Sequence, residues 1–108
     1  MKGTYLKFYV HEKRRLHGVP AYEWLLEQAR KLGIHGGNAF RGVAGFGRHG
    51  KLHEDHFYEL HGDLPVEIGF AVSDDEAERL LKLLTDERVS LFYVRIPADI
   101  GVSGPAQG

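Results

Sequence analysis

The sequence has no cysteine, which excludes disulfides and thiolate metal sites and is consistent with a reducing compartment. It also lacks any run near the roughly 20 apolar residues that span a bilayer, and its first residues do not resemble a signal peptide. A large excess of charge of one sign is missing too, since the net charge is −1 with neutral histidines. We therefore expect a cytoplasmic protein with no nucleic-acid partner.

The hydrophobic pattern predicts a small α+β domain. A length of 108 residues is that of a single domain. Alternating apolar residues predict strands, and apolar residues at helical spacing predict helices. The expected strands are residues 4–10, 38–46, 66–72 and 91–96, and the expected helices are residues 20–32 and 73–85. This order is that of a ferredoxin-like βαββαβ fold, an antiparallel sheet with two helices on one face.

Local signals mark the ends of these elements. Pro20 suits the first turn of a helix, and Gly33 suits its end. The run from Ser73 to Glu76 has the S-x-x-E form of a capping box. We expect residues 1–97 to form the domain and residues 98–108, which are rich in glycine and proline, to form a flexible C-terminal tail.

The face of the sheet turned away from the helices is predicted to be aromatic. On the expected strands, this face would carry Tyr5, Lys7, Tyr9, Tyr93 and Arg95. Tyrosine is enriched at protein interfaces, which favours oligomerisation through this face. The alternative is a half-solvated face with scattered aromatic residues.

The stretch RGVAGFGRHGK, residues 41–51, combines glycines with cationic side chains. Backbone N–H groups of such a segment can form a concave anion site, to which Arg41, Arg48 and Lys51 can add positive charge. It is neither a phosphate-binding P-loop nor a dinucleotide fingerprint, because no Gly-Lys-Ser/Thr follows and no helix begins there. Taken alone, the composition favours a solvated connection between two strands.

Two quoted segments resemble a known family. AGFGRHGK, followed by LPVEIGFAVSDDEAERLL, is similar to the PII nitrogen-regulatory proteins. The earlier part, KFYVHEKRRLHGVPAYEWLLEQARKLGIHGGNAFRGVAGFG, resembles still more closely a widespread group of small PII-like proteins of unassigned function. Together these resemblances cover about residues 3–96.

The resemblance implies a trimer of ferredoxin-like subunits whose sheets face inward and whose clefts between subunits bind an adenine nucleotide. The positions that match the G-F-G-R motif are Gly45, Phe46, Gly47 and Arg48. We add Arg41, Lys51 and Arg88 for their charge and expected proximity. No cofactor is required, and the candidate ligands are ADP, AMP, ATP or a cyclic nucleotide. The second phosphate loop of PII has no counterpart here, which favours the ligands with fewer phosphates.

The resemblance also implies a regulatory rather than an enzymatic role. Occupancy would be transmitted by residues 49–63 to a protein target, for which a membrane transporter, a channel and an enzyme all remain open. No nucleophile has an obvious paired base, so we expect no catalytic residue.

Four histidines within residues 49–61 raise a different hypothesis. In a helical turn, His53 and His56 can share a metal ion, although the H-E-x-x-H spacing is one residue short. The alternative function is therefore a trimeric metal-binding protein that uses this histidine-rich loop. A structural trimer without a ligand is a third possibility.

Overall fold

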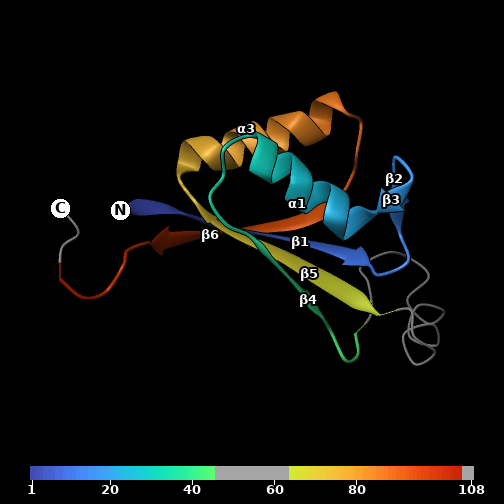
Figure 1. Ribbon diagram of the computed structural model, residues 1–108, viewed down its shortest axis with the longest axis horizontal. Helices are drawn as coiled ribbons and strands as arrows, with labels where there is room; N and C mark the ends of the chain where they lie inside the picture. The colour runs from blue at the N-terminus through green and yellow to red at the C-terminus, as the bar shows by residue number, and fades with distance from the viewer. Residues whose placement is uncertain (46–63, 106–108) are drawn as a thin grey trace.

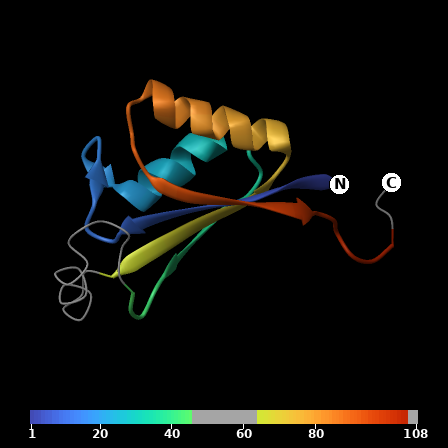
Figure 2. The ribbon, with the colours of Figure 1, turned by 180° about the vertical axis from the view of Figure 1, so that it is seen from behind.

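The computed structural model describes residues 1–45 and 64–105. They form a four-stranded sheet in the order β4-β5-β1-β6, in which every neighbouring pair is antiparallel. Helices α1 and α3 lie on the same face of the sheet (Figures 1 and 2). The elements are β1 Lys2–His11, β2 Arg15–Leu16, β3 Val19–Pro20, α1 Ala21–Lys31, β4 Asn38–Arg41, β5 Pro65–Val72, α3 Asp74–Asp86 and β6 Phe92–Asp99. The predicted α+β fold is confirmed.

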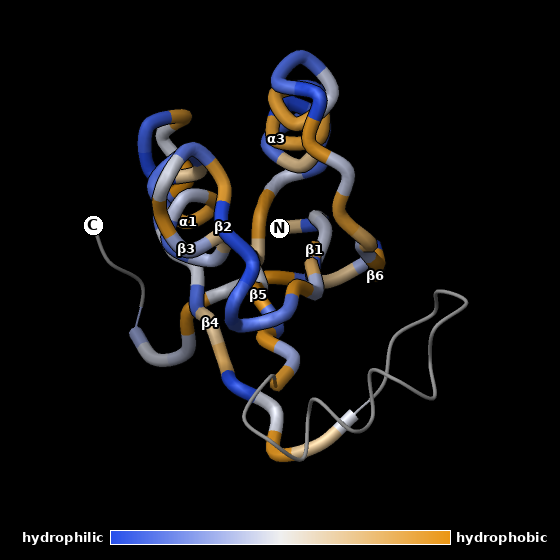
Figure 3. The backbone as a smooth tube through the Cα atoms, turned by 90° about the vertical axis from the view of Figure 1, so that its right-hand side faces the viewer, coloured by the Kyte–Doolittle hydropathy of each residue, from blue (hydrophilic) through white to orange (hydrophobic). Residues whose placement is uncertain are grey.

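The core lies between the sheet and the two helices, which stand over it side by side (Figure 3). Alternation in β1 and β5 turns one set of apolar side chains toward the helices, including Leu6, Phe8, Ile68 and Phe70, all at most 1% exposed. Phe8 and Phe70 meet edge to face, with their ring centroids 6.2 Å apart. The helices contribute buried residues at helical spacing, namely Ala21, Trp24, Leu25 and Ala29 from α1 and Ala77, Leu80 and Leu84 from α3.

The predicted helix ends are confirmed. Ser73 Oγ accepts a hydrogen bond from the Glu76 N–H at 3.0 Å, and Glu76 Oε1 accepts one from the Ser73 N–H at 2.9 Å. The capping box is therefore complete. At the end of α1, Gly33 follows the C-cap residue with a φ of 88°, a conformation that glycine adopts without strain. Pro20, which was expected in the first turn, instead lies just outside the helix as its N-cap residue and ends β3.

A β-hairpin lies between β1 and α1, in a stretch for which the sequence predicted neither strand nor helix. Leu16 pairs with Val19, and the two residues between them have positive φ, 51° at His17 and 83° at Gly18. This is the geometry of a two-residue type I′ turn. The signal available in the sequence was the His17-Gly18 pair between the apolar residues Leu16 and Val19. The His17 ring also lies 5.4 Å from the Trp24 ring, which joins the hairpin to α1.

The predicted assignment of β6 side chains to faces is wrong. The register puts Tyr93 opposite Phe8 and Arg95 opposite Leu6, so Tyr93 and Arg95 lie on the helix side of the sheet. Arg95 there donates to Glu78 of α3 at 2.6 Å. The alternation was correct, but the more apolar set of β6, namely Phe92, Val94 and Ile96, lies on the side away from the helices. An edge strand is only half covered by helices, so hydropathy could not identify its inner set.

The opposite face, which no helix covers, is here called the open face. Register and alternation assign to it Gly3, Tyr5, Lys7, Tyr9, His11, Asn38, Phe40, Pro65, Glu67, Gly69, Ala71, Phe92, Val94, Ile96 and Ala98. Tyr9 and Phe92 lie in contact on it, with ring centroids 5.7 Å apart. The open face is therefore as aromatic as expected, but β6 contributes the other half of its side chains.

Two strands differ from their expected lengths. β4 ends at Arg41, short of the expected end at residue 46. β6 continues through Pro97 to Asp99, which pairs with Lys2. Proline is tolerated there because β6 is an edge strand with one unpaired side. The next residue, Ile100, exchanges hydrogen bonds with Met1, so the first residue is tied to the end of β6. The division into residues 1–97 and 98–108 stays a prediction.

Candidate functional site

The glycine-rich segment leaves the sheet at the end of β4 and returns at the start of β5. Arg41 pairs with Val66, and the Gly42 N–H donates to the Pro65 carbonyl at 2.7 Å. Gly45 is half-buried, and a Cβ at its position would lie 3.3 Å from the Pro65 ring. The segment therefore starts at one end of the sheet, between two strands whose pairing is fixed.

Glu12 joins both ends of this segment. Its Oε1 lies 3.2 Å from Arg41 Nε, and its Oε2 accepts a hydrogen bond from the Leu64 N–H at 3.3 Å. Its own N–H donates to the Leu64 carbonyl at 2.8 Å. The Glu12 side chain is 18% exposed and that of Arg41 is 60% exposed. Any anion that binds Arg41 must therefore compete with a carboxylate already in place.

Glu12 was not among the sequence-predicted site residues. It follows β1 directly and lies far in sequence from the segment that it holds. No local pattern in the sequence predicts such a contact, because the contact depends on the pairing of β1 with β5. Only an acidic residue next to the basic run of residues 13–15 hinted at a charged partner.

Arg88 lies in the turn after α3. Its φ is 58°, its N–H donates to the Thr85 carbonyl at 3.0 Å, and its side chain is exposed. The β2–β3 hairpin contacts this turn twice: Arg14 Nη1 donates to the Ser90 carbonyl at 3.1 Å, and His17 Nε2 lies 3.5 Å from Glu87 Oε1. The contacts of the described residues thus tie Arg41 to Glu12 and Arg88 to its own turn, without joining the two arginines in one site.

The other predicted nucleotide contacts, Phe46, Gly47, Arg48 and Lys51, lie outside the described residues, as do His53 and His56. Within residues 1–45 and 64–105, no cluster of three or more histidine, cysteine, aspartate or glutamate residues could hold a metal ion. The metal hypothesis thus depends on residues outside the described part and stays a prediction.

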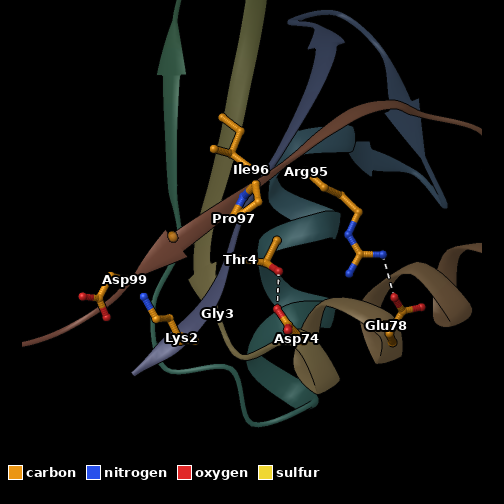
Figure 4. A pocket seen from close by; sticks show the side chains of 10 residues that line it. Lys2, Gly3, Thr4, Asp74, Glu78, Arg95, Ile96, Pro97 and Asp99 are labelled. Atoms are coloured by element: carbon orange, nitrogen blue, oxygen red, sulfur yellow. Dashed lines mark hydrogen bonds and ion pairs between the residues drawn. The ribbon is translucent and has the colours of Figure 1, made fainter.

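A groove of about 670 Å³ lies beside the start of α3 (Figure 4). Thr4 Oγ1 donates to Asp74 Oδ1 at 2.6 Å across it, and Arg95 binds Glu78. The hydrogen bond with Glu78 raises the pKa of Arg95 above its ordinary value. Because these charged groups bind one another, the groove connects α3 to the sheet and is a poor candidate for a ligand site.

The open face carries one ion pair. Lys7 Nζ lies 3.6 Å from Glu67 Oε1 and 5.8 Å from the centroid of the Tyr5 ring. The Glu67 carboxylate is the main cause that raises the pKa of Lys7 above its ordinary value, followed by Tyr9. Apart from the imidazole of His11, the remaining described side chains of this face are aromatic, aliphatic or amide groups.

Comparison with known proteins identifies the family. The model of the family DUF190 (Uncharacterized ACR, COG1993) matches residues 3–91. The chain belongs to the DUF190 family. A UPF0166 protein of Aquifex aeolicus (strain VF5) is 28% identical to it over 102 residues, which cover 87% of this chain and 97% of that protein. A UPF0166 protein of Methanocaldococcus jannaschii is 29% identical over 84 residues, which cover 78% and 77% of the two chains.

The fold of this DUF190 protein is also similar to a solved structure. A protein of Thermus thermophilus, described provisionally as a PII-like signalling protein, superposes with a TM-score of 0.55 at 13% identity. The match covers 90% of this chain and 85% of that one. The resemblance stated from the sequence is thus confirmed for the family and the fold. Neither helix of the described part is long and apolar enough to cross a membrane.

Proposed function

We propose that this DUF190 protein is a non-enzymatic regulatory protein of the PII-like type. It forms a trimer, binds an adenine nucleotide or a related small anion between subunits, and regulates a partner protein. The observation that carries the proposal is the position of the G-F-G-R match within this fold. The segment that begins with Arg41-Gly42 and contains the G-F-G-R match connects β4 to β5 in a fold similar to that of a PII-like protein.

The proposed ligand is ADP, AMP, ATP or a cyclic nucleotide. Arg48 provides the forked guanidinium that suits phosphate oxygens, while Gly45 and Gly47 let the backbone approach the ligand closely. Lys51 and Arg88 add positive charge. Arg41 takes part only after it leaves Glu12, so its contribution to affinity is reduced by the loss of that ion pair.

The open face supports the proposed trimer. Phe40 is 58% exposed, Phe92 42% and Ile96 41%, although all three lie on a sheet whose other face is a dry core. Phe40 lies on one edge strand and Phe92 and Ile96 on the other, so large apolar side chains are exposed on both sides of this face, and exposed apolar surface is typical of an interaction site. Covering it with other subunits would also create the crevices in which the ligand is proposed to bind. The partner protein is then one of the classes that PII-like regulation implies: a transporter, a channel or an enzyme.

Isothermal titration calorimetry with ATP, ADP, AMP and cyclic nucleotides tests the ligand. We expect the wild-type protein to bind at least one of them, and Arg48→Ala to weaken that binding by about tenfold or more, because hydrogen bonds to charged groups contribute about 1.5–3 kcal/mol. Arg30→Ala is the matched control, since Arg30 is an exposed arginine of α1 paired with Glu27 at 2.6 Å. Absence of heat with every nucleotide at millimolar concentration would overturn the nucleotide proposal.

A further inference from the structure

The β2–β3 hairpin and the turn after α3 meet at one end of the molecule (Figures 1 and 2). Arg14, which directly precedes β2, donates to the Ser90 carbonyl, and His17 at the hairpin tip lies 3.5 Å from Glu87. Two segments that are far apart in the sequence are therefore held side by side. Their side chains form one continuous surface.

The arginines of this surface differ from the others in their partners. Elsewhere in the described part, each arginine pairs with a carboxylate, and these arginines are Arg30, Arg41, Arg79 and Arg95. Arg14 and Arg15 instead donate to neutral backbone carbonyls, and Arg88 has no carboxylate partner among the described residues. We call these three exposed side chains, together with the exposed Lys13, the basic patch.

A carbonyl partner and a carboxylate partner have different consequences for an arginine. A carboxylate neutralises the guanidinium, whereas a carbonyl orients it and leaves its charge and its other N–H groups available. An arginine that is already oriented also loses less side-chain entropy when it binds. The basic patch is therefore prepared for an anionic partner that the described part of the chain does not itself supply.

The backbone marks the same place independently of charge. Among the described residues other than glycine, positive φ occurs at His17 and Arg88, with values of 51° and 58°. Such conformations cost free energy for a residue with a Cβ, and they gather at functional sites. Glycine would adopt the Arg88 conformation without this cost, so the turn does not require the arginine side chain.

An apolar groove of about 460 Å³ adjoins the basic patch. Its apolar lining includes Leu81, Leu84, Val89, Leu91 and Tyr93. Ser90, whose carbonyl holds Arg14, belongs to the same lining, and Arg88 directly precedes it in the sequence. The surface thus combines a place for an apolar side chain with cationic groups at its edge.

We propose that the basic patch and this groove bind an acidic segment of the partner protein, with an apolar side chain in the groove and carboxylates on the arginines. The inference rests on the proposed regulation of a partner and adds the chemistry of the docking segment. The groove favours a peptide over a free phosphate, because a phosphate has no apolar group to bury.

The overall charge disfavours a membrane or a nucleic acid as the occupant. The net charge of the chain is −1 although the patch is basic, so the rest of the molecule is acidic. An extended anionic surface would also face that acidic remainder and be repelled by it. A short acidic segment meets only the basic patch and avoids this repulsion.

Fluorescence anisotropy with labelled synthetic peptides tests the proposal. The probe alternates one leucine with two glutamates, and its control peptides carry glutamine in place of glutamate or glycine in place of leucine. We expect the probe to bind the wild-type protein more tightly than either control peptide does. Arg14→Gln/Arg15→Gln should weaken probe binding by about tenfold or more, because hydrogen bonds between charged groups are lost.

Arg30→Gln/Lys31→Gln is the matched control, because it removes two adjacent exposed cations from α1. It should bind the probe as the wild type does, and equal weakening in both variants would show non-specific attraction and overturn the inference. Trp24 is the only tryptophan of the chain and contacts His17, so its fluorescence shows whether the hairpin keeps its place. Arg15→Gln alone is a second test that leaves the Arg14–Ser90 contact intact, and it should also weaken probe binding.

The outcomes separate this inference from the proposed nucleotide site. Arg14 and Arg15 are not among the residues proposed to bind the nucleotide, so their variant should keep the wild-type nucleotide affinity in calorimetry. If the probe does not bind at millimolar concentration, or binds no better than its glutamine control, the inference is wrong and the proposed function stands. Arginine-dependent binding of inorganic phosphate or of phosphatidylserine vesicles, without binding of the probe, would identify a small anion or a membrane and overturn the inference as well.

Discussion

At the residue scale, Gly3 shows how closely the start of β1 approaches its neighbours. Its position is buried, and a Cβ there would clash with the Val72 carbonyl oxygen and lie 2.9 Å from Ile100 Cδ1. The carbonyl belongs to the backbone of the adjoining strand and cannot rotate away as a flexible side chain would. Glycine is therefore required at this position by space rather than by backbone conformation.

We expect Gly3→Ala to lower the free energy of unfolding by about 2–3 kcal/mol, because overpacking forces the two strands apart. Urea denaturation followed by circular dichroism measures this change. Gly36→Ala is the control, since a Cβ at Gly36 would meet nothing within 4 Å. Equal stability of the two variants would contradict this account of the β1–β5 contact.

At the element scale, α3 is held by its first turn. Asp74, Asp75 and Glu76 place three carboxylates near the positive end of the helix. Ser73 and Glu76 satisfy two backbone N–H groups, and Asp74 accepts the hydrogen bond from the buried Thr4 of β1. The first turn thus both starts the helix and fixes it to the sheet.

Ser73→Ala should destabilise the protein by about 1 kcal/mol, the usual cost of losing an N-cap side chain. The expected change is a lower midpoint of urea denaturation with an unchanged slope. Ser90→Ala is a matched control, because Ser90 is exposed and its described contact uses the backbone carbonyl. An unchanged midpoint for Ser73→Ala would show that the other residues of the first turn stabilise α3 without the Ser73 side chain.

At the scale of the whole molecule, the helices cover one face of the sheet and leave the other uncovered (Figures 1 and 3). The proposed association buries Lys7, whose pKa is raised chiefly by the Glu67 carboxylate. A raised lysine pKa means that the folded state favours the ionised form. Its contribution is complete below the ordinary lysine pKa of about 10.4 and is lost as the pH rises through the raised value.

We therefore expect wild-type association to be weaker at about pH 11 than at pH 8, with the loss confined to pH values above about 10.4, and Lys7→Arg to retain more of it because arginine stays ionised. Sedimentation velocity at both pH values gives the ratio of assembled to monomeric protein. Tyr5 and Tyr9 are common to both proteins, so the difference isolates Lys7. Lys82→Arg is the control, and it should follow the wild type at each pH.

The sequence predicted most of the fold because its strongest patterns are local. Alternation in β5, the helical spacing of α1 and α3, the capping box and Gly33 each depend on residues close together in the chain. The β2–β3 hairpin was missed because its strands have only two residues each. The inner set of β6 was misassigned because it depends on register with β1, a long-range property.

The candidate site was less predictable for the same reason. Arg41 was selected for its charge, but its contact with Glu12 follows from the pairing of three strands. Lys7 was placed correctly on the open face, whereas its partner Glu67 was not singled out, because nothing local connects residues 60 positions apart. The charge of a residue was enough to select it as a candidate, but the pairing of the strands determines which of the candidates lie in contact.

The contacts of Glu12 with Arg41 and Leu64 have a consequence for how proteins with this fold can diversify. The carboxylate and the backbone N–H of Glu12 connect Arg41 and Leu64, the two flanks of residues 42–63, so the strands on either side stay in register independently of what lies between them. Doubling the length of a flexible insert adds only about 0.6 kcal/mol of closure entropy. Segments of different length or composition can therefore be exchanged at this position while the scaffold beneath them is preserved.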